Sequence, residues 1–427
     1  MSFQFKHLIY PVRKECTLIL NPVFPVTVNE NVEYTVKVGA YSGLRLYGLR
    51  GQKGAPTKKD QEFFDKLHPL CVCGDHLEFT MTFPQEDCYR LWLYLDGQQV
   101  DMYEVYALEE DLFTKTPFKG DNHMHTCMSD GKETPMYVAA CACRTGYDYC
   151  VITDHYEYAP SVMTKEFYEP TGVDFLVIPG EEIHSPGNWV HIVGMGGRES
   201  VDAWWRKDQS EYDAAVAKEM EKITEPMLDQ DRFEAAASQV VFDRVRSVGG
   251  ISILAHPKWV ITKGFAAAED VIDYLFEHRR FDAVELIAGG ADESGTQMQV
   301  SDYLEKEHIP IVGSSDTHGC YADSLQPHNY TVVFADSLET ESIKQAILSG
   351  NTIAGDGYKL YGNYRLVKYG YFLRWNYFPE HEEQRRELGA QMQFYASRQP
   401  GPESKEGQEL KLIRPSERFA ALRYQQP

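Results

Sequence analysis

Two histidines separated by a single residue lie in the segment 121–131, whose sequence is DNHMHTCMSDG. Side chains two positions apart on an extended strand leave the same face, so His123 and His125 present their imidazoles together. Two neighbouring imidazoles are a pair of nitrogen ligands for a divalent metal. Asp130 follows at an expected turn, which brings a carboxylate back towards the same end.

Similar groups recur along the chain, and most of them end or interrupt a short apolar run. They are ITDH ending at His155, GEE ending at Glu182, HIVG starting at His191, AHP around His256 and SDTH from Ser315 to His318. Together these segments offer nine metal-capable positions: His123, His125, Asp130, His155, Glu182, His191, His256, Asp316 and His318. One catalytic zinc takes about three protein ligands, so the sequence predicts two or three divalent ions. Clustered ions suit phosphoryl chemistry, because they offset the charge of ester oxygens.

An alternation of strands and helices from residue 117 onwards must position these groups. The expected strands are residues 122–125, 149–153, 175–180, 189–195, 250–255, 283–288 and 309–313, with helices at 134–144, 267–278 and 300–307. Most of the strands are continuous apolar runs, which is typical of buried parallel strands. The histidine and carboxylate groups fall at the C-terminal ends of strands. A (β/α) barrel gathers such ends on one rim, whereas an open sheet holds its outer strands too far apart, so the pattern favours a barrel.

The chain as a whole is expected to have three parts. Residues 1–112 contain short alternating runs separated by turn formers such as Asp96-Gly97, and they predict a small antiparallel β-sandwich domain. The barrel is expected over residues 113–357, with a helical insertion at 197–249 that either covers its mouth or joins subunits in a homo-oligomer. Residues 358–427 are expected to form a C-terminal extension.

Charge and cysteine content limit the partners and the compartment. The formal net charge of −22 argues against binding to double-stranded nucleic acid or an anionic membrane. We expect no signal peptide, and no apolar run approaches the roughly 20 residues that span a bilayer, so a cytoplasmic protein is expected. Nine cysteines, an odd number, then favour reduced thiols. Cys71 and Cys73 would need a second pair of ligands to bind zinc, and burial as small hydrophobic side chains is their more common role.

The order H-x-H…D, T-D-H, G-x-E, H, H-P and S-D-x-H resembles the polymerase and histidinol phosphatase (PHP) superfamily over residues 118–357. The resemblance implies a distorted (β/α)7 barrel and a metal-dependent phosphoesterase. It implies a first metal bound by His123, His125, Glu182 and Asp316, and a second metal, bridged by Glu182, bound by His191 and His256. It implies a third metal bound by Asp130, His155 and His318. Relatives with the largest site often have histidine at the position of Asp130, and a carboxylate there favours manganese or iron over zinc.

Three positions leave alternatives open. His184 shares a face with Glu182 by strand alternation, so either His184 or His191 can be the ligand, and His191 is preferred on family order. Glu181 is the alternative to Glu182 and should face away from it. Asp154 either orients a neighbouring ligand as a hydrogen-bond acceptor or holds a turn.

The expected activity is hydrolysis of a small phosphate ester, of the nucleotide or sugar phosphate type, by a metal-bound hydroxide. The expected catalytic residues are Glu182, Asp316 and His318, with two or three manganese, iron or zinc ions as cofactors. The candidate substrate-binding residues are Lys258, Arg198, Lys132 and His184, the first three as cations for the phosphate. The alternatives are a hydrolase of a non-phosphate substrate and a carbohydrate-binding or partner-binding protein whose barrel is a metal-bearing scaffold. A 3′–5′ exonuclease is disfavoured by the negative charge.

Overall fold

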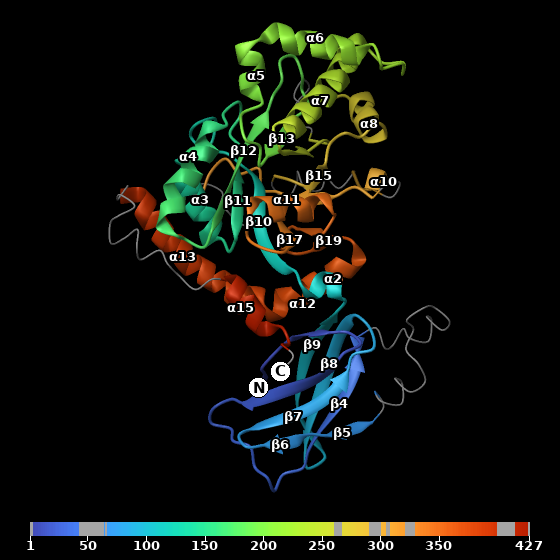
Figure 1. The fold of residues 1–427 in the computed structure, drawn as a ribbon, viewed down its shortest axis with the longest axis vertical. Helices are drawn as coiled ribbons and strands as arrows, with labels where there is room; N and C mark the ends of the chain where they lie inside the picture. Colours follow the sequence, from blue (N-terminus) through green and yellow to red (C-terminus); the bar gives the residue numbers. More distant parts are fainter. Residues whose placement is uncertain are drawn as a thin grey trace. The chain divides into compact units, whose positions relative to one another are not determined.

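The computed structural model describes residues 3–41, 64, 66–259, 267–289, 300–304, 308–320, 329–398 and 415–425. The chain forms two compact units (Figure 1). The first contains Met1–Thr116 together with Arg414–Pro427, and the second contains Pro117–Ile413. Residues of the expected C-terminal extension are therefore shared between the two units. Among the described helices, none is long and apolar enough to cross a membrane.

Two sheets enclose the apolar core of the first unit. One has the strand order β1 (Phe3–Phe5), β3 (Glu15–Pro22), β7 (His76–Thr82) and β6 (Cys71–Cys73). The other has the order β2 (Ile9–Pro11), β9 (Gln98–Leu108), β8 (Asp87–Leu95), β4 (Tyr34–Ala40) and β5 (Leu67–Pro69). Asp96 and Gly97 form the turn between β8 and β9 with φ angles of 47° and 77°, as a two-residue hairpin turn requires. The antiparallel sheets predicted for this region are confirmed, apart from β2, which runs parallel to β9.

A single ten-stranded sheet, nearly closed into a barrel, forms the centre of the second unit. Its order is β16 (Ile311–Gly313), β15 (Ala283–Ile287), β14 (Ile251–Leu254), β13 (Ile192–Met195), β12 (Leu176–Ile183), β11 (Tyr149–Ile152), β10 (Thr116–Met124), β17 (Tyr330–Ala335), β18 (Thr352–Gly355) and β19 (Leu360–Gly362). β16, at one end of this order, contacts β17 and β18 near the other end. The Gly313 N–H of β16 donates to Thr331 Oγ1 of β17 at 2.9 Å, and Thr352 Oγ1 of β18 donates to the Ile311 carbonyl of β16 at 2.7 Å. An α/β barrel-like fold is thus observed, while the count of seven (β/α) units stays a prediction.

One strand of the barrel runs against its neighbours. β10, β11 and β12 are parallel, and so are β14, β15 and β16, but β13 is antiparallel to both β12 and β14. The expectation of a parallel strand over residues 189–195 is therefore wrong in direction. The segment 184–191 that joins β12 to β13 is too short for a parallel crossover, which needs a dozen or more residues, so the chain turns back as a hairpin.

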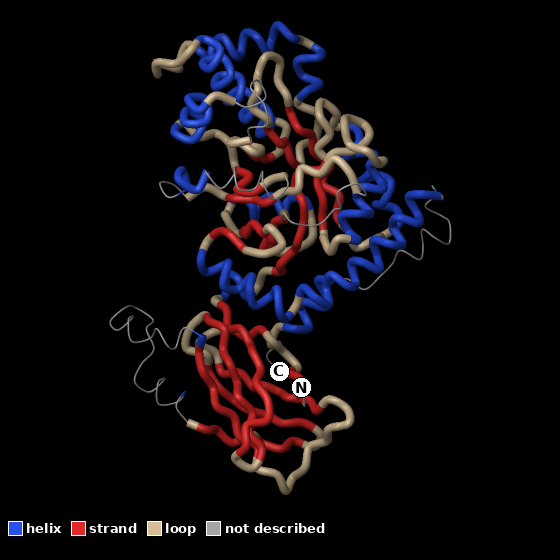
Figure 2. The backbone as a smooth tube through the Cα atoms, turned by 180° about the vertical axis from the view of Figure 1, so that it is seen from behind, coloured by secondary structure: helices blue, strands red, loops and turns tan. Residues whose placement is uncertain are grey.

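Helices lie outside the strands of the barrel (Figure 2). They include α3 (Pro135–Arg144), α4 (Ala159–Tyr168), α8 (Glu269–Glu277), α10 (Ser301–Leu304) and α11 (Thr340–Leu348). The helices predicted at 134–144 and 267–278 are confirmed as α3 and α8, and Pro135 occupies the first turn of α3, where its missing N–H costs nothing. The expected helix at 300–307 is represented by α10, and residues 305–307 lie outside the described part of the chain.

The insertion at 197–249 forms α5 (Asp202–Lys207), α6 (Gln209–Met220) and α7 (Asp229–Ser247). Their apolar sides share one buried cluster with Ile192 of β13 and Leu254 of β14, which point out of the barrel because their strand neighbours Val193 and Ile253 point in. The apolar sides of these helices therefore pack against the outer wall, and the coverage of the barrel mouth by the insertion stays a prediction.

The last described helices of the second unit are α12 (Tyr364–Asn376) and α13 (Phe378–Arg398). α13 lies along α3, and a Cβ on Gly389 would overlap the backbone of Arg144, so the two helices meet at glycine. Near its start, the buried Arg385 and His381 side chains both pair with Asp148. These charges lower the pKa of Asp148 to about 2, although burial alone would raise it.

Candidate metal centre

The predicted ligands gather at one rim of the barrel, where the parallel strands end. His123 is the next-to-last residue of β10, and Glu182 is the next-to-last of β12. His256 follows β14, and Asp316 follows β16. Because the C-terminal ends of parallel strands meet at the same edge, residues more than 190 positions apart come into contact: His125 Nε2 lies 3.0 Å from Asp316 Oδ1.

The reversed direction of β13 explains why His191 joins this group. His191 directly precedes β13, and the N-terminal end of an antiparallel strand lies beside the C-terminal ends of its neighbours. His191 Nδ1 is 2.8 Å from Glu182 Oε1. His184, the alternative ligand, is also at this rim, with its Nε2 2.8 Å from His155 Nδ1 and 3.7 Å from Glu182 Oε2.

Glu182 lies in the middle of the cluster and faces histidines with both carboxylate oxygens. Oε1 is 2.8 Å from His191 Nδ1 and 3.2 Å from His256 Nε2. Oε2 is 3.2 Å from His123 Nε2 and 2.8 Å from His155 Nδ1. A carboxylate surrounded in this way can bridge two ions.

A second, more open group of ligands surrounds Asp130. Its Oδ2 lies 3.4 Å from His155 Nε2 and 3.3 Å from His318 Nε2, and its Oδ1 lies 3.8 Å from His125 Nδ1. About half of the Asp130 side chain is exposed, whereas His125 is buried. Solvent therefore reaches the cluster from the side of Asp130.

The residues brought together fit divalent metal ions. Groups of ligand atoms within 4.8 Å of one another are formed by His125, Asp130, His155 and His318; by His123, Glu182 and His256; by His123, His125 and Asp316; and by His155, Glu182 and His184. Among the described atoms, several buried ones at this rim have no hydrogen-bond partner: His123 Nε2, His125 Nδ1, His191 Nδ1 and Glu182 Oε2. Such atoms are costly to bury unsatisfied, and ligands about 2.1 Å from one ion lie roughly 3 Å apart, as these do.

Carboxylates and imidazoles lie close together in the cluster, and each shifts the pKa of its neighbours. Burial opposes a positive charge on His123, but Asp316 and Glu182 outweigh it and raise its pKa well above the ordinary value. The same carboxylates, against the effect of burial, raise the pKa of His125 to about 9. Burial likewise opposes the negative charge of Glu182, yet His123 and His191 hold its pKa well below the usual range. Burial lowers the pKa of His191 to about 4, which leaves its ring neutral and able to bind a metal.

Glu285 is a functional candidate that the sequence analysis missed. It lies in β15 on the inner face of the barrel, with Oε1 3.0 Å from His123 Nδ1 and Oε2 accepting the His256 N–H at 2.9 Å. A carboxylate on the second ring nitrogen of a ligand histidine fixes its tautomer and orientation. The signal in the sequence is a charged residue inside the apolar run AVELIA, at residues 283–288.

Asp154 and Glu181, whose roles the sequence leaves undecided, both accept hydrogen bonds that hold neighbouring segments of the chain. Asp154 accepts hydrogen bonds from the Thr126 N–H at 2.8 Å and from Ser129 Oγ at 2.7 Å, so it holds the turn after His125. Glu181 faces away from Glu182, as alternation predicts, and accepts hydrogen bonds from Ser200 Oγ and the Val201 N–H. Burial raises the pKa of Glu181 to about 7.

Backbone strain is concentrated at the same rim. Among the described residues other than glycine, five have a positive φ, and three of them are at the rim: Tyr156 at 61°, His256 at 24° and Asp316 at 51°. L-residues adopt this region at a cost of about 1–3 kcal/mol, which the surrounding structure must offset. Strain at two proposed ligands is typical of a functional site.

The predicted phosphate-binding cations are placed unequally. Lys132 packs its stem against Gly319, beside His318. The Lys258 ammonium pairs with Glu269 at 2.8 Å and lies over the Tyr303 ring. Arg198 lies beside the start of β14, against Ser247 and Gly249, whereas the ligands follow the opposite end of that strand. Arg198 is therefore not placed to contact a substrate at the rim.

The sequence analysis missed Arg206, which α5 brings to the rim. Its guanidinium donates to the Tyr156 carbonyl and lies 3.5 Å from Glu157 Oε1, in the segment that follows His155. The Tyr156 side chain is about half exposed, with its ring centre 5.0 Å from that of His184. Arg206 and Lys132 are thus the cations nearest to the ligands among those described above.

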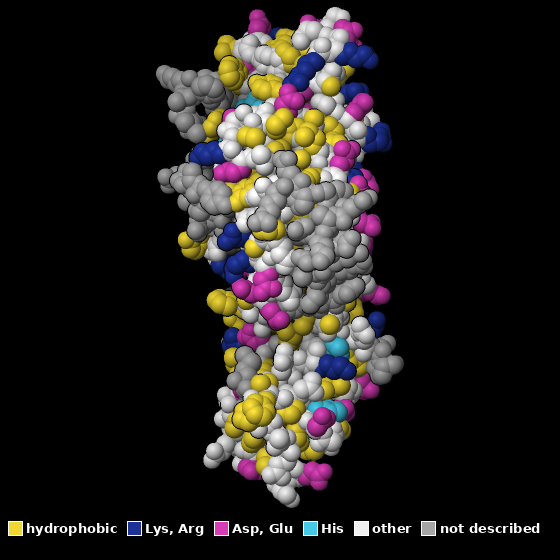
Figure 3. All heavy atoms as spheres, turned by 90° about the vertical axis from the view of Figure 1, so that its left-hand side faces the viewer, with side chains coloured by type: hydrophobic (Ala, Val, Ile, Leu, Met, Phe, Trp, Pro, Cys, Tyr) yellow, Lys and Arg dark blue, Asp and Glu magenta, His cyan; other side chains and the backbone are white. Residues whose placement is uncertain are grey.

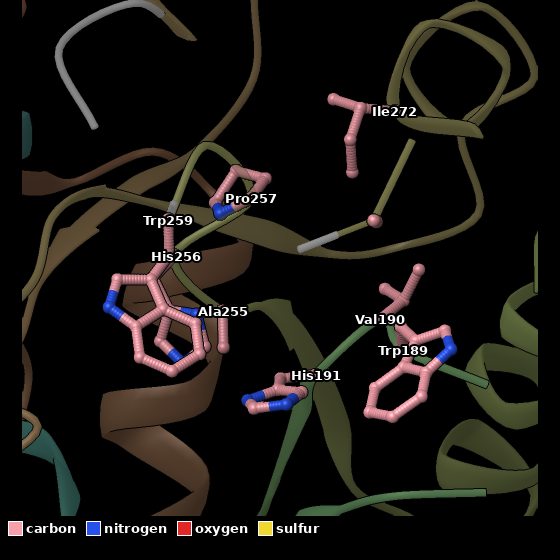
Figure 4. A pocket seen from close by; sticks show the side chains of 9 residues that line it. Trp189, Val190, His191, Ala255, His256, Pro257, Trp259 and Ile272 are labelled. Atoms are coloured by element: carbon pink, nitrogen blue, oxygen red, sulfur yellow. The ribbon is translucent and has the colours of Figure 1, made fainter. Parts of the chain in front are cut away.

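An apolar pocket adjoins the proposed second metal site. Figure 4 shows Trp259 against His256, with His191 between Trp259 and Trp189. The Trp259 ring centre is 5.3 Å from that of His256 and 5.9 Å from that of His191. The other lining residues are apolar: Val190, Ala255, Pro257, Ala267 and Ile272. The two histidines are therefore the polar groups of this pocket.

Comparison with known proteins gives matches only among solved structures. No family model matches the sequence, and no curated protein matches it. A two-domain protein from Bacteroides vulgatus, containing a predicted PHP-like metal-dependent phosphoesterase, is 20% identical with a TM-score of 0.42, over 60% of this chain and 69% of that one. A structure from Bifidobacterium adolescentis, described as a metal-dependent phosphoesterase, is 17% identical with a TM-score of 0.35, over 54% and 96%.

An amidohydrolase from Chromobacterium violaceum, with bound sulfate, is 16% identical with a TM-score of 0.33, over 48% of this chain and 89% of that one. All three TM-scores are below 0.5, a level at which similarity supports no inference about activity. The function proposed below therefore depends on the residues of this chain.

Proposed function

We propose that the second unit is a metal-dependent hydrolase of the PHP type and that it hydrolyses a small phosphate ester. The observation that carries this proposal is the convergence of the nine metal-capable residues at one rim, with Glu182 between two sets of histidines. Divalent ions bound here would lower the pKa of a water molecule and offset charge on substrate oxygens. A structural role alone would not require so many buried ligand atoms without a hydrogen-bond partner among the described residues.

The residues of the chain would divide into three tasks. His123, His125 and Asp316 would hold one ion with Glu182, while His191 and His256 would hold another on the opposite oxygen of that carboxylate. Asp130, His155 and His318 would hold an ion on the open side, where substrate enters. Glu285 would fix the His123 ring through its Nδ1–H.

His318 has a hydrogen bond that prepares it for this role. Its Nδ1 lies 2.9 Å from the Asp316 carbonyl oxygen, which can only accept a hydrogen bond, so the Nδ1 carries the proton. In the neutral ring this leaves the lone pair of Nε2 directed towards Asp130, as a metal ligand requires. The side chain is 39% exposed, which allows exchange of protons with solvent.

The surface charge favours a small substrate over a polynucleotide. The net charge is −22. On the face shown in Figure 3, Lys and Arg side chains alternate with Asp and Glu, and the described residues there form no continuous basic track. A nuclease would need such a track to hold a strand. Lys132 and Arg206 are enough for one phosphate group.

A non-phosphate ester or amide is the second candidate. It is favoured by the placement of Arg198 away from the rim and by the pairing of Lys258 with Glu269, which leave few cations for a phosphate. The same ligand set would activate water towards a lactone or an amide.

One experiment separates the two candidates. The manganese-loaded protein is incubated with phosphomonoesters, phosphodiesters, lactones and amides in heavy-oxygen water. We expect turnover of a phosphomonoester or phosphodiester, with the label in the phosphoryl product, and loss of turnover in His125→Ala with the fold retained. Turnover of a lactone or amide alone would contradict the phosphoesterase assignment. If the protein turns over none of these compounds with manganese, iron or zinc, the proposal that it is an enzyme is contradicted.

A further inference from the structure

A second set of metal-capable side chains lies in the first unit, on the hairpin formed by β6 and β7. Cys71 pairs with Glu78 and Cys73 pairs with His76 in the register of these antiparallel strands. Directly opposed residues of an antiparallel pair point to the same side of the sheet, and so do residues two apart on one strand. The two thiols, the imidazole and the carboxylate therefore share one face of the hairpin.

This face is the outer one. Leu77, which lies between His76 and Glu78, is fully buried in the core of the unit, and Val72, between the two cysteines, packs against the same core. Cys71 is exposed and Cys73 is partly exposed. The expectation that these cysteines are buried hydrophobic side chains is therefore wrong.

The side chains on this face already interact with one another. His76 Nε2 lies 3.0 Å from Glu78 Oε1, and His76 Nδ1 lies 3.2 Å from Asp75 Oδ1. These two carboxylates raise the pKa of His76, Glu78 having the larger effect. Partial desolvation, followed by the nearby Glu78 carboxylate, raises the pKa of Cys73. A cation at this position would satisfy the carboxylate and the thiol together.

The backbone spacing of the four residues allows their side chains to rotate towards one tetrahedral ion. Opposed Cβ atoms are about 4.5–5.5 Å apart across an antiparallel pair, and Cα atoms two apart on a strand are about 6.6 Å apart. Two thiolates at about 2.3 Å from a zinc ion are roughly 3.8 Å apart, a separation that Cys71 and Cys73 reach by turning their side chains inwards. Gly74, with a φ of 66°, keeps the connecting turn tight.

We propose that Cys71, Cys73, His76 and Glu78 form a zinc site, separate from the histidine cluster of the barrel. Thiolate ligands select a softer ion such as zinc over manganese, whereas the carboxylates and imidazoles of the barrel accept harder ions. Binding deprotonates both thiols and releases two protons to solvent. The ion would tie the edge strand β6 to β7.

The first test uses cobalt as a spectroscopic replacement for zinc in the full-length, reduced, metal-free protein. Thiolate ligation of Co²⁺ gives an intense charge-transfer band, which the imidazole and carboxylate ligands of the barrel do not give. We expect this band in the wild type, its loss in Cys71→Ser/Cys73→Ser, and its retention in Cys127→Ser, which removes an exposed thiol beside the barrel cluster. Absence of the band in the wild type, or its survival in the double variant, would overturn the proposal.

A second test needs no variant, so it does not depend on how a mutant folds. The reduced protein is treated with an alkylating reagent with and without zinc, and each cysteine is followed by mass spectrometry. Cys71 and Cys73 should lose their reactivity in the presence of zinc, while Cys88, a partly exposed thiol of the same unit, keeps its own. Equal alkylation of Cys71 and Cys73 with and without zinc would show that no site exists.

Discussion

Glu182 is the side chain on which the arrangement of the metal centre depends most. One carboxylate oxygen lies 2.8 Å from His191 and the other 3.2 Å from His123. Glutamine in its place would offer one carbonyl oxygen and an N–H₂ donor, which cannot bind a cation. In the metal-free protein the neighbouring carboxylates raise the pKa of His123 and of His125 and so favour their protonated rings, and binding of an ion must displace these protons.

Glu285→Gln should weaken metal binding without unfolding the protein. The substitution keeps the size of the side chain but removes the negative charge that faces His123 Nδ1. Loss of such an outer carboxylate typically costs 10- to 100-fold in metal affinity, so we expect a change of about that size. Titration calorimetry with Mn²⁺ measures it.

The matched control is Glu277→Gln, at the exposed end of α8. It should bind Mn²⁺ as tightly as the wild type does. Equal affinity of Glu285→Gln and the wild type would show that the carboxylate has no part in orienting the ligand.

The buried carboxyl group of Asp202 should lower the free energy of unfolding of the wild-type protein at neutral and alkaline pH. It is fully buried at the start of α5, and neither carboxylate oxygen has a hydrogen-bond partner among the described residues. Burial, and then the charge of Glu181, raises its pKa to about 9. The folded protein therefore keeps a proton that the unfolded chain has lost, and stability falls as pH rises from about 4 to 9.

Asp202→Asn removes this cost, because the amide is never charged. We expect the variant to be more stable than the wild type at pH 8 by a few kcal/mol, since each unit of pKa shift is worth about 1.4 kcal/mol. The gain should shrink as the pH approaches 4. Denaturant unfolding at several pH values measures the difference. A gain that does not depend on pH would contradict the assignment, and Asp213→Asn, on the exposed side of α6, should show no such trend.

At the scale of elements, the direction of β13 decides which residues reach the rim. Hydrophobic periodicity predicts that residues 189–195 are a strand but carries no information about its direction. The decisive signal is the length of the 184–191 connection, which excludes a parallel crossover. The same reversal places His191 with the other ligands and carries Arg198 away from them. The order of motifs in the family therefore selected His191, which lies at the rim, whereas the position of Arg198 after the same strand was misjudged.

The contact between α3 and α13 should be sensitive to a single methyl group. Gly389→Ala places a Cβ on the backbone of Arg144, so α13 must move away from α3. Overpacking of this kind typically costs about 1–3 kcal/mol, and here it also disturbs the neighbouring buried pair of Arg385 and Asp148.

Thermal unfolding of Gly389→Ala should show this loss, with metal affinity unchanged because the rim ligands are not involved. Glu387→Ala, at an exposed position of the same helix, is the control and should unfold as the wild type does. Unaltered stability of Gly389→Ala would mean that the two helices do not pack as closely as described.

At the scale of the whole molecule, the two compact units should respond differently to metal. Only the second unit contains the histidine cluster, so Mn²⁺ should raise its unfolding temperature and leave that of the first unit unchanged. An ion at 100 times its Kd stabilises the folded state by about 2.7 kcal/mol. Differential scanning calorimetry of the metal-free and manganese-loaded protein measures both transitions. Equal shifts of the two, or a shift that persists in His125→Ala, would contradict this assignment.

The sequence predicts the site better than its surroundings, for a physical reason. Candidate ligands such as His123 and His125 are recognisable because residue type and spacing are local properties. The contact of Glu285 with His123 depends on which strand lies opposite, as does the pairing of Cys71 and Cys73 with residues of β7. Pairing between strands is a property of the folded chain, and a single sequence specifies it only weakly.

The reversed β13 also determines where the barrel has room to grow. β13 runs away from the metal rim, so the residues after it leave the sheet towards the far end of the barrel. From that end α5 carries the chain back to the rim, where Arg206 contacts the Tyr156 carbonyl, and α6 and α7 complete the outer wall beside β14. Residues inserted directly after β13 would therefore extend the end opposite the metal rim, whereas changes in α5 would alter the open side, because Arg206 contacts the Tyr156 carbonyl there. Evolution, or an engineer inserting a reporter domain, can therefore enlarge the protein at Gly196 and Gly197 while the reacting end keeps its dimensions.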